Sequence, residues 1–264
     1  MPKRLELTIE GERGRIPLET FATVIHNSFD ILSDLDSAIS SEPRGTLEWF
    51  VSEVSFGSLV VSIESKSKLP KVDYSPKVVE YFVGGLRHIQ KERTTPPYFS
   101  DYGLRKAQSL AHTLRREDGA RAVVIRDVES EDTATIEPEI SIDLGRLISV
   151  RYQEAGSVEG KLEMISIHGV PRFTVYHAIT RHSIRCKFDP RRFMDVVRNA
   201  LGERVIVSGI VYFNYKHEPI RVELENLAIL PREEELPSPS EIRGMSPDFT
   251  GELTTEEYIR SLRE

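Results

Sequence analysis

The composition of the chain excludes several classes of protein before any motif is considered. Its 264 residues exceed the length of one average domain, and an apolar fraction of 39% is enough for hydrophobic cores. A formal net charge of -7 argues against a protein whose whole surface coats nucleic acid. The sequence therefore predicts two domains and an appended segment.

The cysteine content and the hydropathy pattern indicate an intracellular environment. The single cysteine, Cys186, excludes an intramolecular disulfide and a Cys-x-x-Cys metal clamp. The first ten residues form a charged, alternating segment without the apolar core of a signal peptide, and no later segment approaches the length needed to span a bilayer. We therefore expect a cytoplasmic protein with no membrane contact.

Residues 1–150 have the periodicities of an α+β domain. Leu5, Leu7 and Ile9 alternate as in a strand. Pro17 begins a helix whose apolar positions recur every three or four residues: Leu18, Phe21, Ile25, Phe29, Leu32, Leu35 and Ile39. The remaining expected elements are strands 46–54, 59–64, 120–128 and 133–137, and helices that begin at Ser75 and Ser100. The predicted arrangement is a mostly antiparallel sheet with helices on one face.

Residues 156–231 have the alternating pattern of a five-stranded OB-fold-like β-barrel. Strands are expected at 157–165, 172–177, 183–188, 204–214 and 220–230, with one helix between the third and the fourth. Asp189 and Pro190 begin that helix, because Asp can accept from free backbone amides and proline suits the first turn. In the first strand Val158, Leu162 and Met164 are expected to face inward, and in the third strand Cys186 is expected to be buried.

Basic side chains gather on the expected outward face and rim of the first three barrel strands. The basic residues are Lys161, Arg172, Arg181, Arg185 and Lys187, and the aromatic Tyr176 lies among them. They predict a surface for single-stranded nucleic acid, in which cations contact phosphates and one ring stacks on a base. The alternative is a structural ladder in which Glu159 and Glu163, on the same face, pair with the basic residues across strands.

The sequence contains no recognisable active site. The histidines of the barrel region, His168, His177, His182 and His217, fit no zinc spacing and are interpreted as solvent-facing loop residues. The chain also has no glycine-rich phosphate loop and no G-x-S-x-G elbow. Carboxylates at Asp34 and Asp36, and at Glu129, Glu131 and Asp132, are of the kind a nuclease uses but are more typical of solvated surface. We therefore expect no catalytic residue, no metal and no cofactor.

The composition of residues 232–264 differs from that of the preceding chain. These residues are expected to form an extended tail with short amphipathic helices. The stretch after Leu230 is polar and rich in proline, with too few apolar residues to fold alone. Ser238 to Glu241 and Thr254 to Glu257 both match the Ser/Thr-x-x-Glu capping box, which marks a helix start. The second helix is too short to be stable in water unless its apolar side finds a groove.

Several segments together resemble a widespread family of uncharacterised bacterial proteins. They are residues 156–169 (GSVEGKLEMISIHG), 184–188 (IRCKF), 202–209 (GERVIVSG) and 251–263 (GELTTEEYIRSLR). The last segment is similar to the ends of small antitoxins, in which a short helix enters the groove of a PIN-domain ribonuclease toxin. The resemblance implies that Tyr258, Ile259 and Leu262 fill apolar pockets, while Arg260 or Arg263 approaches the acidic metal site of the toxin.

Two hypotheses of function follow from these observations. The first is a non-enzymatic interaction protein of a toxin-antitoxin type, whose C-terminal segment binds and restrains a protein partner such as a PIN-domain toxin. The second is a protein that binds single-stranded nucleic acid on the barrel face. A small PIN-domain reading frame beside the gene would favour the first hypothesis.

Overall fold

The computed structural model describes residues 3–12, 14–42, 44–56, 59–114, 119–231, 235, 251 and 253–262. The chain has mixed α and β content and two five-stranded sheets. It divides into two compact units, Met1–Ile229 and Leu230–Glu264. Within the first unit each sheet has its own hydrophobic core.

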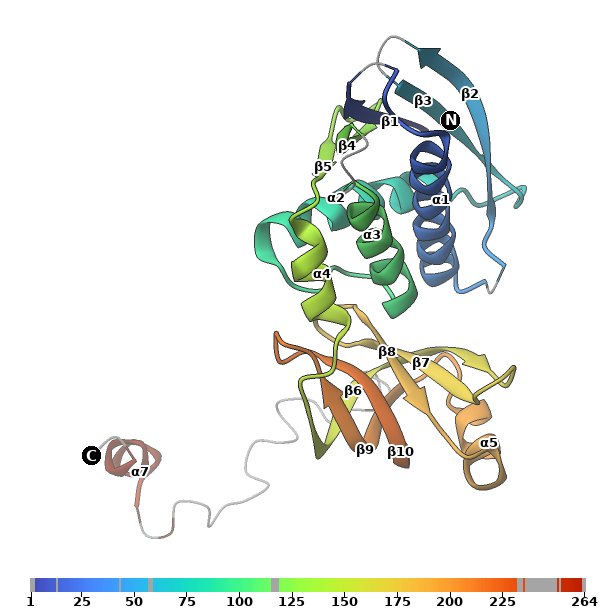
Figure 1. Cartoon of the computed structure of the whole chain (residues 1–264). Helices are drawn as coiled ribbons and strands as arrows, with labels where there is room; N and C mark the ends of the chain where they lie inside the picture. The colour runs from blue at the N-terminus through green and yellow to red at the C-terminus, as the bar shows by residue number, and fades with distance from the viewer. Residues whose placement is uncertain are drawn as a thin grey trace. The chain divides into compact units, whose positions relative to one another are not determined.

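The N-terminal sheet is antiparallel in all of its pairings and has the order β2-β3-β1-β4-β5 (Figure 1). The strands are β1 (Arg4–Gly11), β2 (Leu47–Phe56), β3 (Leu59–Ser67), β4 (Ala120–Asp127) and β5 (Thr133–Ile136). Leu5, Leu7 and Ile9 are buried, which confirms the predicted alternation of the first strand. The helices that pack with this sheet are α1 (Leu18–Ser40), α2 (Ser75–Glu92), α3 (Asp101–Thr113) and α4 (Ile140–Ile148).

Helix α1 presents most of its predicted stripe to the core, since Phe21, Ile25 and Ile39 pack against it. Leu32 and Leu35 are buried as expected, but Leu18 and Phe29 are exposed, and Val24 and Ile31 are fully buried in their place. The sequence contains apolar residues on two adjoining faces of this helix, so periodicity alone does not show which face meets the core. The predicted helix at α2 is confirmed together with its buried stripe: Val79, Phe82, Val83, Leu86 and Ile89.

The second sheet closes on itself because β10 pairs with both β8 and β9. Its strands are β6 (Tyr152–Ser166), β7 (Arg172–His177), β8 (Ser183–Lys187), β9 (Arg204–Phe213) and β10 (Pro219–Ile229). The order is β10-β8-β7-β6-β9, and the β8–β10 pair is parallel. Helix α5 (Pro190–Asn199) follows Asp189, whose Oδ1 accepts a hydrogen bond from the backbone N–H of Arg191 at 3.0 Å. The predicted helix start is therefore confirmed.

The prediction that Met164 faces inward is wrong. The register of β6 against β7 shifts between Leu162 and Met164, which places one extra residue in β6. Such a bulge reverses the facing of every later side chain in the strand. Ile165 consequently packs against the core of the closed sheet, and Met164 lines a cleft on its outer face.

In the second unit the structure describes one short helix, α7 (Thr255–Ser261). The Oγ1 of Thr254 accepts from the backbone N–H of Glu257 at 3.3 Å, and the carboxylate of Glu257 accepts from the N–H of Thr254 at 2.9 Å. The predicted capping box at this position is therefore confirmed. The other predicted capping box, Ser238 to Glu241, lies outside the described residues.

Candidate functional site

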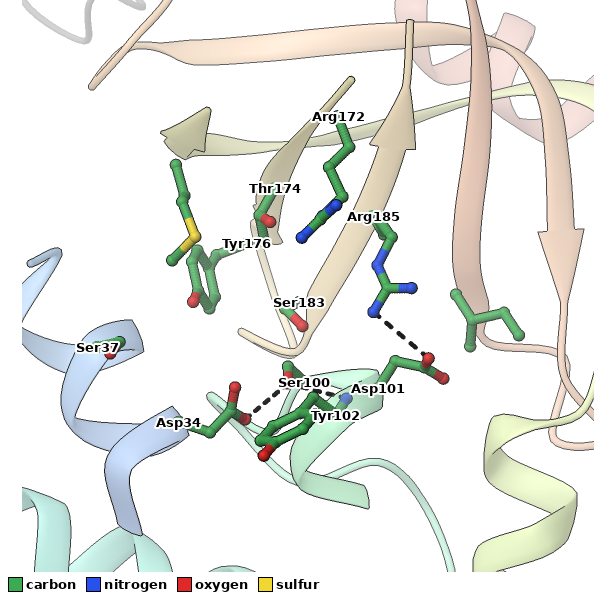
Figure 2. A pocket seen from close by; sticks show the side chains of 12 residues that line it. Asp34, Ser37, Ser100, Asp101, Tyr102, Arg172, Thr174, Tyr176, Ser183 and Arg185 are labelled. Carbon is green, nitrogen blue, oxygen red and sulfur yellow. Dashed lines mark hydrogen bonds and ion pairs between the residues drawn. The ribbon is translucent and has the colours of Figure 1, made fainter. Parts of the chain in front are cut away.

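A polar cleft lies between the N-terminal helices and the outer face of the closed sheet (Figure 2). We call it the Asp34 cleft; its volume is about 160 Å³. One wall comes from α1 and the first turn of α3, and the other from β6, β7, β8 and β10. The residues that line it are Asp34, Ser37, Ser100, Asp101, Tyr102, Met164, Arg172, Thr174, Tyr176, Ser183, Arg185 and Ile220.

Asp34 lies in the helix wall of this cleft. The hydroxyl of Ser100 donates a hydrogen bond to its Oδ2 at 2.6 Å, and Figure 2 shows its other oxygen pointing into the cleft. Burial raises the pKa of the Asp34 carboxyl to about 6, against the opposing effects of hydrogen bonds from Ser100 and Gly103 and of the charge on Arg185. Asp34 can therefore exchange a proton near neutral pH.

Ser100 links Asp34 to the start of α3. Its Oγ accepts from the backbone N–H groups of Tyr102 at 3.1 Å and Gly103 at 3.2 Å, as an N-cap residue does. A Cβ added to Gly103 would lie 2.7 Å from the Oδ2 of Asp34, so a larger residue there would collide with the carboxylate. The local sequence of α3 therefore fixes the position of Asp34.

Asp101 lies opposite the sheet wall and accepts two cations. Its Oδ2 is 3.4 Å from the guanidinium of Arg185 in β8 and 3.1 Å from the Nε of Arg105 in α3. This ion pair connects the closed sheet to the N-terminal helices. Arg185 is thus held toward the cleft rather than toward open solvent (Figure 2).

Like charges lie side by side on the sheet wall. Arg172 is directly opposite Lys187 across the antiparallel β7–β8 pair, and Arg185 is the register partner of Arg221 across the parallel β8–β10 pair. Glu223 is the register partner of Lys187 in β10, but the two do not form an ion pair. Neighbouring like charges destabilise a sheet. The ion pair of Arg185 with Asp101 and the Arg221 guanidinium, 3.9 Å from the ring centroid of Tyr212, offset part of this cost. Arg172 and Lys187 have no carboxylate partner among the described residues.

Tyr176 points to the outer face as predicted, but it is not free to stack on a base. Its side chain is 3% exposed, and its ring centroid lies 6.0 Å from that of Tyr98. Burial raises the pKa of its phenol. The loop before α3 covers this part of the face, because the backbone N–H of Tyr98 donates to the carbonyl of Arg181 at 3.0 Å. The sequence pattern of β7 contains no sign of this cover.

The remaining predicted face residues do not all meet in one place. Lys161 and Arg181 line a separate groove of about 420 Å³ together with Arg204 and three small residues, Gly160, Ala178 and Gly202. Lys161 pairs with Glu163 at 3.1 Å, and Arg204 pairs with Glu159. The alternative prediction of cross-strand pairing thus holds only for Glu159, whose partner is Arg204 in β9, because Glu163 pairs within β6. Arg172 and Lys187 have no carboxylate partner among the described residues.

The interpretation of His182 as a solvent-facing loop residue is wrong. It is buried, its Nδ1 lies 2.6 Å from the Oγ1 of Thr180, and its Nε2 donates to the carbonyl of Pro219 at 3.1 Å. Its ring stacks on that of His177 at 5.3 Å. Both ring nitrogens have partners, so burial costs little. No group of three or more metal-ligating side chains gathers within the part of the chain that the structure describes.

Two other carboxylates singled out in the sequence have local structural roles. Asp36 is buried and accepts from the backbone N–H groups of Thr46 at 2.6 Å and Leu47 at 2.8 Å, which fixes the start of β2. Asp132 pairs with Arg87 at 2.8 Å. Neither of them lines the Asp34 cleft.

The residues predicted to bind a partner lie on and beside α7. Ile259 is 45% exposed and Leu262 is 69% exposed, whereas Tyr258 is half-buried. Arg260 is exposed, and Arg263 lies outside the described residues. A capped helix with exposed apolar side chains is suited to dock into an apolar groove.

No protein-family model matches the chain, and no curated protein matches it. Within the described residues, no helix combines the length and the apolar character required to cross a membrane.

Proposed function

We propose that the chain is a non-enzymatic binding protein whose C-terminal segment binds and restrains a protein partner. A PIN-domain toxin is the expected kind of partner, because the tail resembles the ends of antitoxins that bind such toxins. The single observation that carries this proposal is the capped helix α7, with Ile259 and Leu262 exposed. A large apolar side chain on a capped turn of helix loses less conformational freedom when it enters a groove than one on an unstructured segment.

The division of the chain is consistent with this role. Residues Leu230–Glu264 form a compact unit distinct from Met1–Ile229. The order of strand pairing in the closed sheet, with its parallel β8–β10 pair, supports an OB-fold-like barrel within the first unit. The fold does not determine the partner.

The test is affinity capture from native cells with the wild type and with the double variant Ile259→Asp, Leu262→Asp. A carboxylate placed in an apolar pocket costs several kcal/mol, which weakens binding by roughly a thousandfold. We expect the variant to lose the captured protein. Capture that is unchanged in the variant would place the contact elsewhere in the chain.

A matched control adds the same two charges at other exposed apolar positions. Ile179 is 85% exposed and Leu201 is 52% exposed. The double variant Ile179→Asp, Leu201→Asp should retain the partner. Nuclease treatment of the lysate before capture separates direct protein binding from binding through nucleic acid.

Single-stranded nucleic acid binding is the second candidate, and one observation favours it. Arg172 and Lys187 lie directly opposite each other without a carboxylate partner among the described residues, as expected for side chains that face phosphates. The double variant Arg185→Glu, Lys187→Glu should remove the affinity for a short oligonucleotide and most of its salt dependence. Wild-type protein that binds no oligonucleotide even at low salt would contradict this candidate.

A further inference from the structure

The two walls of the Asp34 cleft have opposite chemistry (Figure 2). The sheet wall presents the guanidinium groups of Arg172 and Arg185, which only donate hydrogen bonds. The helix wall presents the carboxylates of Asp34 and Asp101. A plain cation or a plain anion would match only one wall, and an apolar molecule would match neither. The ligand that fits has an anionic group at one end and hydrogen-bond donors at the other.

The cations of the sheet wall point to the anionic end of such a ligand. Arg172 with Lys187 and Arg185 with Arg221 are like-charge neighbours, and of these four only Arg185 has an ion-pair partner within the described ranges, Asp101. Arrangements that cost stability are expected where a site serves function. Two arginine forks on adjacent strands match the oxygens of a phosphate better than lysines would.

The helix wall points to the other end of the ligand. One oxygen of Asp34 accepts from Ser100, and the other is directed into the cleft. A carboxylate in this position accepts hydrogen bonds from hydroxyl groups. The volume of about 160 Å³ suits a small molecule, because a water molecule occupies roughly 30 Å³ of liquid.

We propose that the Asp34 cleft binds a small, hydroxyl-bearing phosphate monoester, with the phosphate on Arg172 and Arg185 and a hydroxyl on the carboxylate of Asp34. This site goes beyond the protein-binding function, and it does not involve residues of α7. Loss of partner capture and loss of phosphate binding are therefore separate results.

Calorimetric titration of the full chain with three probes tests both ends of the site. The probes are ribose 5-phosphate, inorganic phosphate and ribose, all at matched ionic strength. We expect ribose 5-phosphate to bind more tightly than inorganic phosphate and ribose not to bind measurably. Equal affinity for ribose 5-phosphate and phosphate, or no binding of either, would overturn the proposal.

Variants assign the binding to this cleft. Among the described residues, the side chain of Arg172 makes one hydrogen bond, to the carbonyl of Val170 at 3.4 Å, so Arg172→Gln should fold normally. It should weaken ribose 5-phosphate binding by roughly tenfold or more, because a charge-assisted hydrogen bond to the phosphate is lost. Arg198→Gln, an exposed arginine of α5, is the matched control and should bind like the wild type. An equal loss in both variants would show non-specific electrostatics.

Asp34→Ala tests the hydroxyl end. Its affinity for ribose 5-phosphate should fall to that for inorganic phosphate, while phosphate binding itself is retained. If the alanine variant fails to fold, Asp34→Asn replaces it and should retain part of the preference. A preference for ribose 5-phosphate that is unchanged in the variant that folds would overturn the assignment of Asp34.

The 5′-phosphate at the end of a nucleic-acid strand offers the same chemical groups and is an alternative ligand for the cleft. Titration with a 5′-phosphorylated oligothymidine and with its unphosphorylated form distinguishes the two ligands. Binding of ribose 5-phosphate supports the small-ligand site. Binding of the phosphorylated oligonucleotide alone would overturn it in favour of a nucleic-acid end.

Discussion

The raised pKa of Asp34 has a measurable consequence for the pH dependence of protein stability. Its pKa rises from 3.8 to about 6 chiefly because it is buried. The folded state then holds the proton more tightly than the unfolded state. The contribution to stability is present in full below about pH 4 and is lost as the pH rises through about 6.

Asp34→Asn removes this titration while it retains an acceptor for the hydroxyl of Ser100. Above pH 7 we expect the variant to be more stable than the wild type by up to about 3 kcal/mol, and at pH 4 we expect similar stabilities. Urea unfolding at both pH values measures the difference. Asp195→Asn, in an exposed position of α5, is the control and should show no such dependence on pH. A parallel shift of both variants would contradict the assignment to Asp34.

Tyr176 gives a second prediction for a single residue. Its ring is buried, and its hydroxyl has no hydrogen-bond partner among the described residues. Tyr176→Phe should therefore leave the free energy of unfolding nearly unchanged, whereas Tyr176→Ala should lower it by about 3 kcal/mol through the cavity that it creates. Chemical denaturation of both variants checks the pair. An alanine variant as stable as the wild type would show that the ring is solvent-exposed in solution.

Individual side chains also show where sequence patterns stop being informative. Val158 and Leu162 follow the predicted alternation, but the bulge after Leu162 turns Met164 outward, and no residue type in β6 marks its position. His182 resembles a turn residue in the sequence. It is buried because Thr180 and the carbonyl of Pro219, which lies 37 residues away, satisfy its ring nitrogens.

Among the elements, α7 has the strongest local signal. The capping box predicted its start at Thr254 from four residues, because the two hydrogen bonds are formed within one turn. Helix α4, by contrast, was not predicted. Its buried residues Ile140, Leu144, Leu147 and Ile148 do have helical spacing, so a search for stripes in short segments would have found it.

Thr254→Ala tests whether the helical form of α7 contributes to partner binding. Loss of the N-cap side chain costs about 1 kcal/mol of helix stability, so the affinity for the captured partner should fall roughly fivefold. Surface plasmon resonance with the purified pair measures this change. Thr254→Ser keeps the capping hydroxyl and should bind like the wild type. Identical affinities for the alanine and serine variants would mean that the partner does not require the preformed helix.

For the whole molecule, the sequence predicted the two sheets but not the cleft between the N-terminal helices and the closed sheet. Alternation and helical spacing are properties of neighbouring residues, and they predicted most of the strands and helices. The Asp34 cleft brings together Asp34 and Ser100, 66 residues apart, with Arg185 from a third region. Only the tertiary structure places these groups together. The sequence indicated the basic half of the site and named Asp34 as a candidate carboxylate, but the interpretation of Asp34 as solvated surface is wrong because its carboxyl group is buried.

Deletion of residues 246–264 tests the independence of the C-terminal segment. Because Leu230–Glu264 is a unit distinct from Met1–Ile229, the thermal transition of the truncated chain should match that of the wild type. Differential scanning calorimetry measures it. A large fall in the transition temperature would show that the tail stabilises its own chain.

We propose that Ile259 and Leu262 of the C-terminal segment provide most of the affinity for a protein partner. The most direct measurement is the dissociation constant between the purified full chain and the purified captured protein, for the wild type and for Ile259→Asp, Leu262→Asp. We expect the dissociation constant of the variant to be roughly a thousandfold higher than that of the wild type. Equal dissociation constants for the two proteins would contradict it.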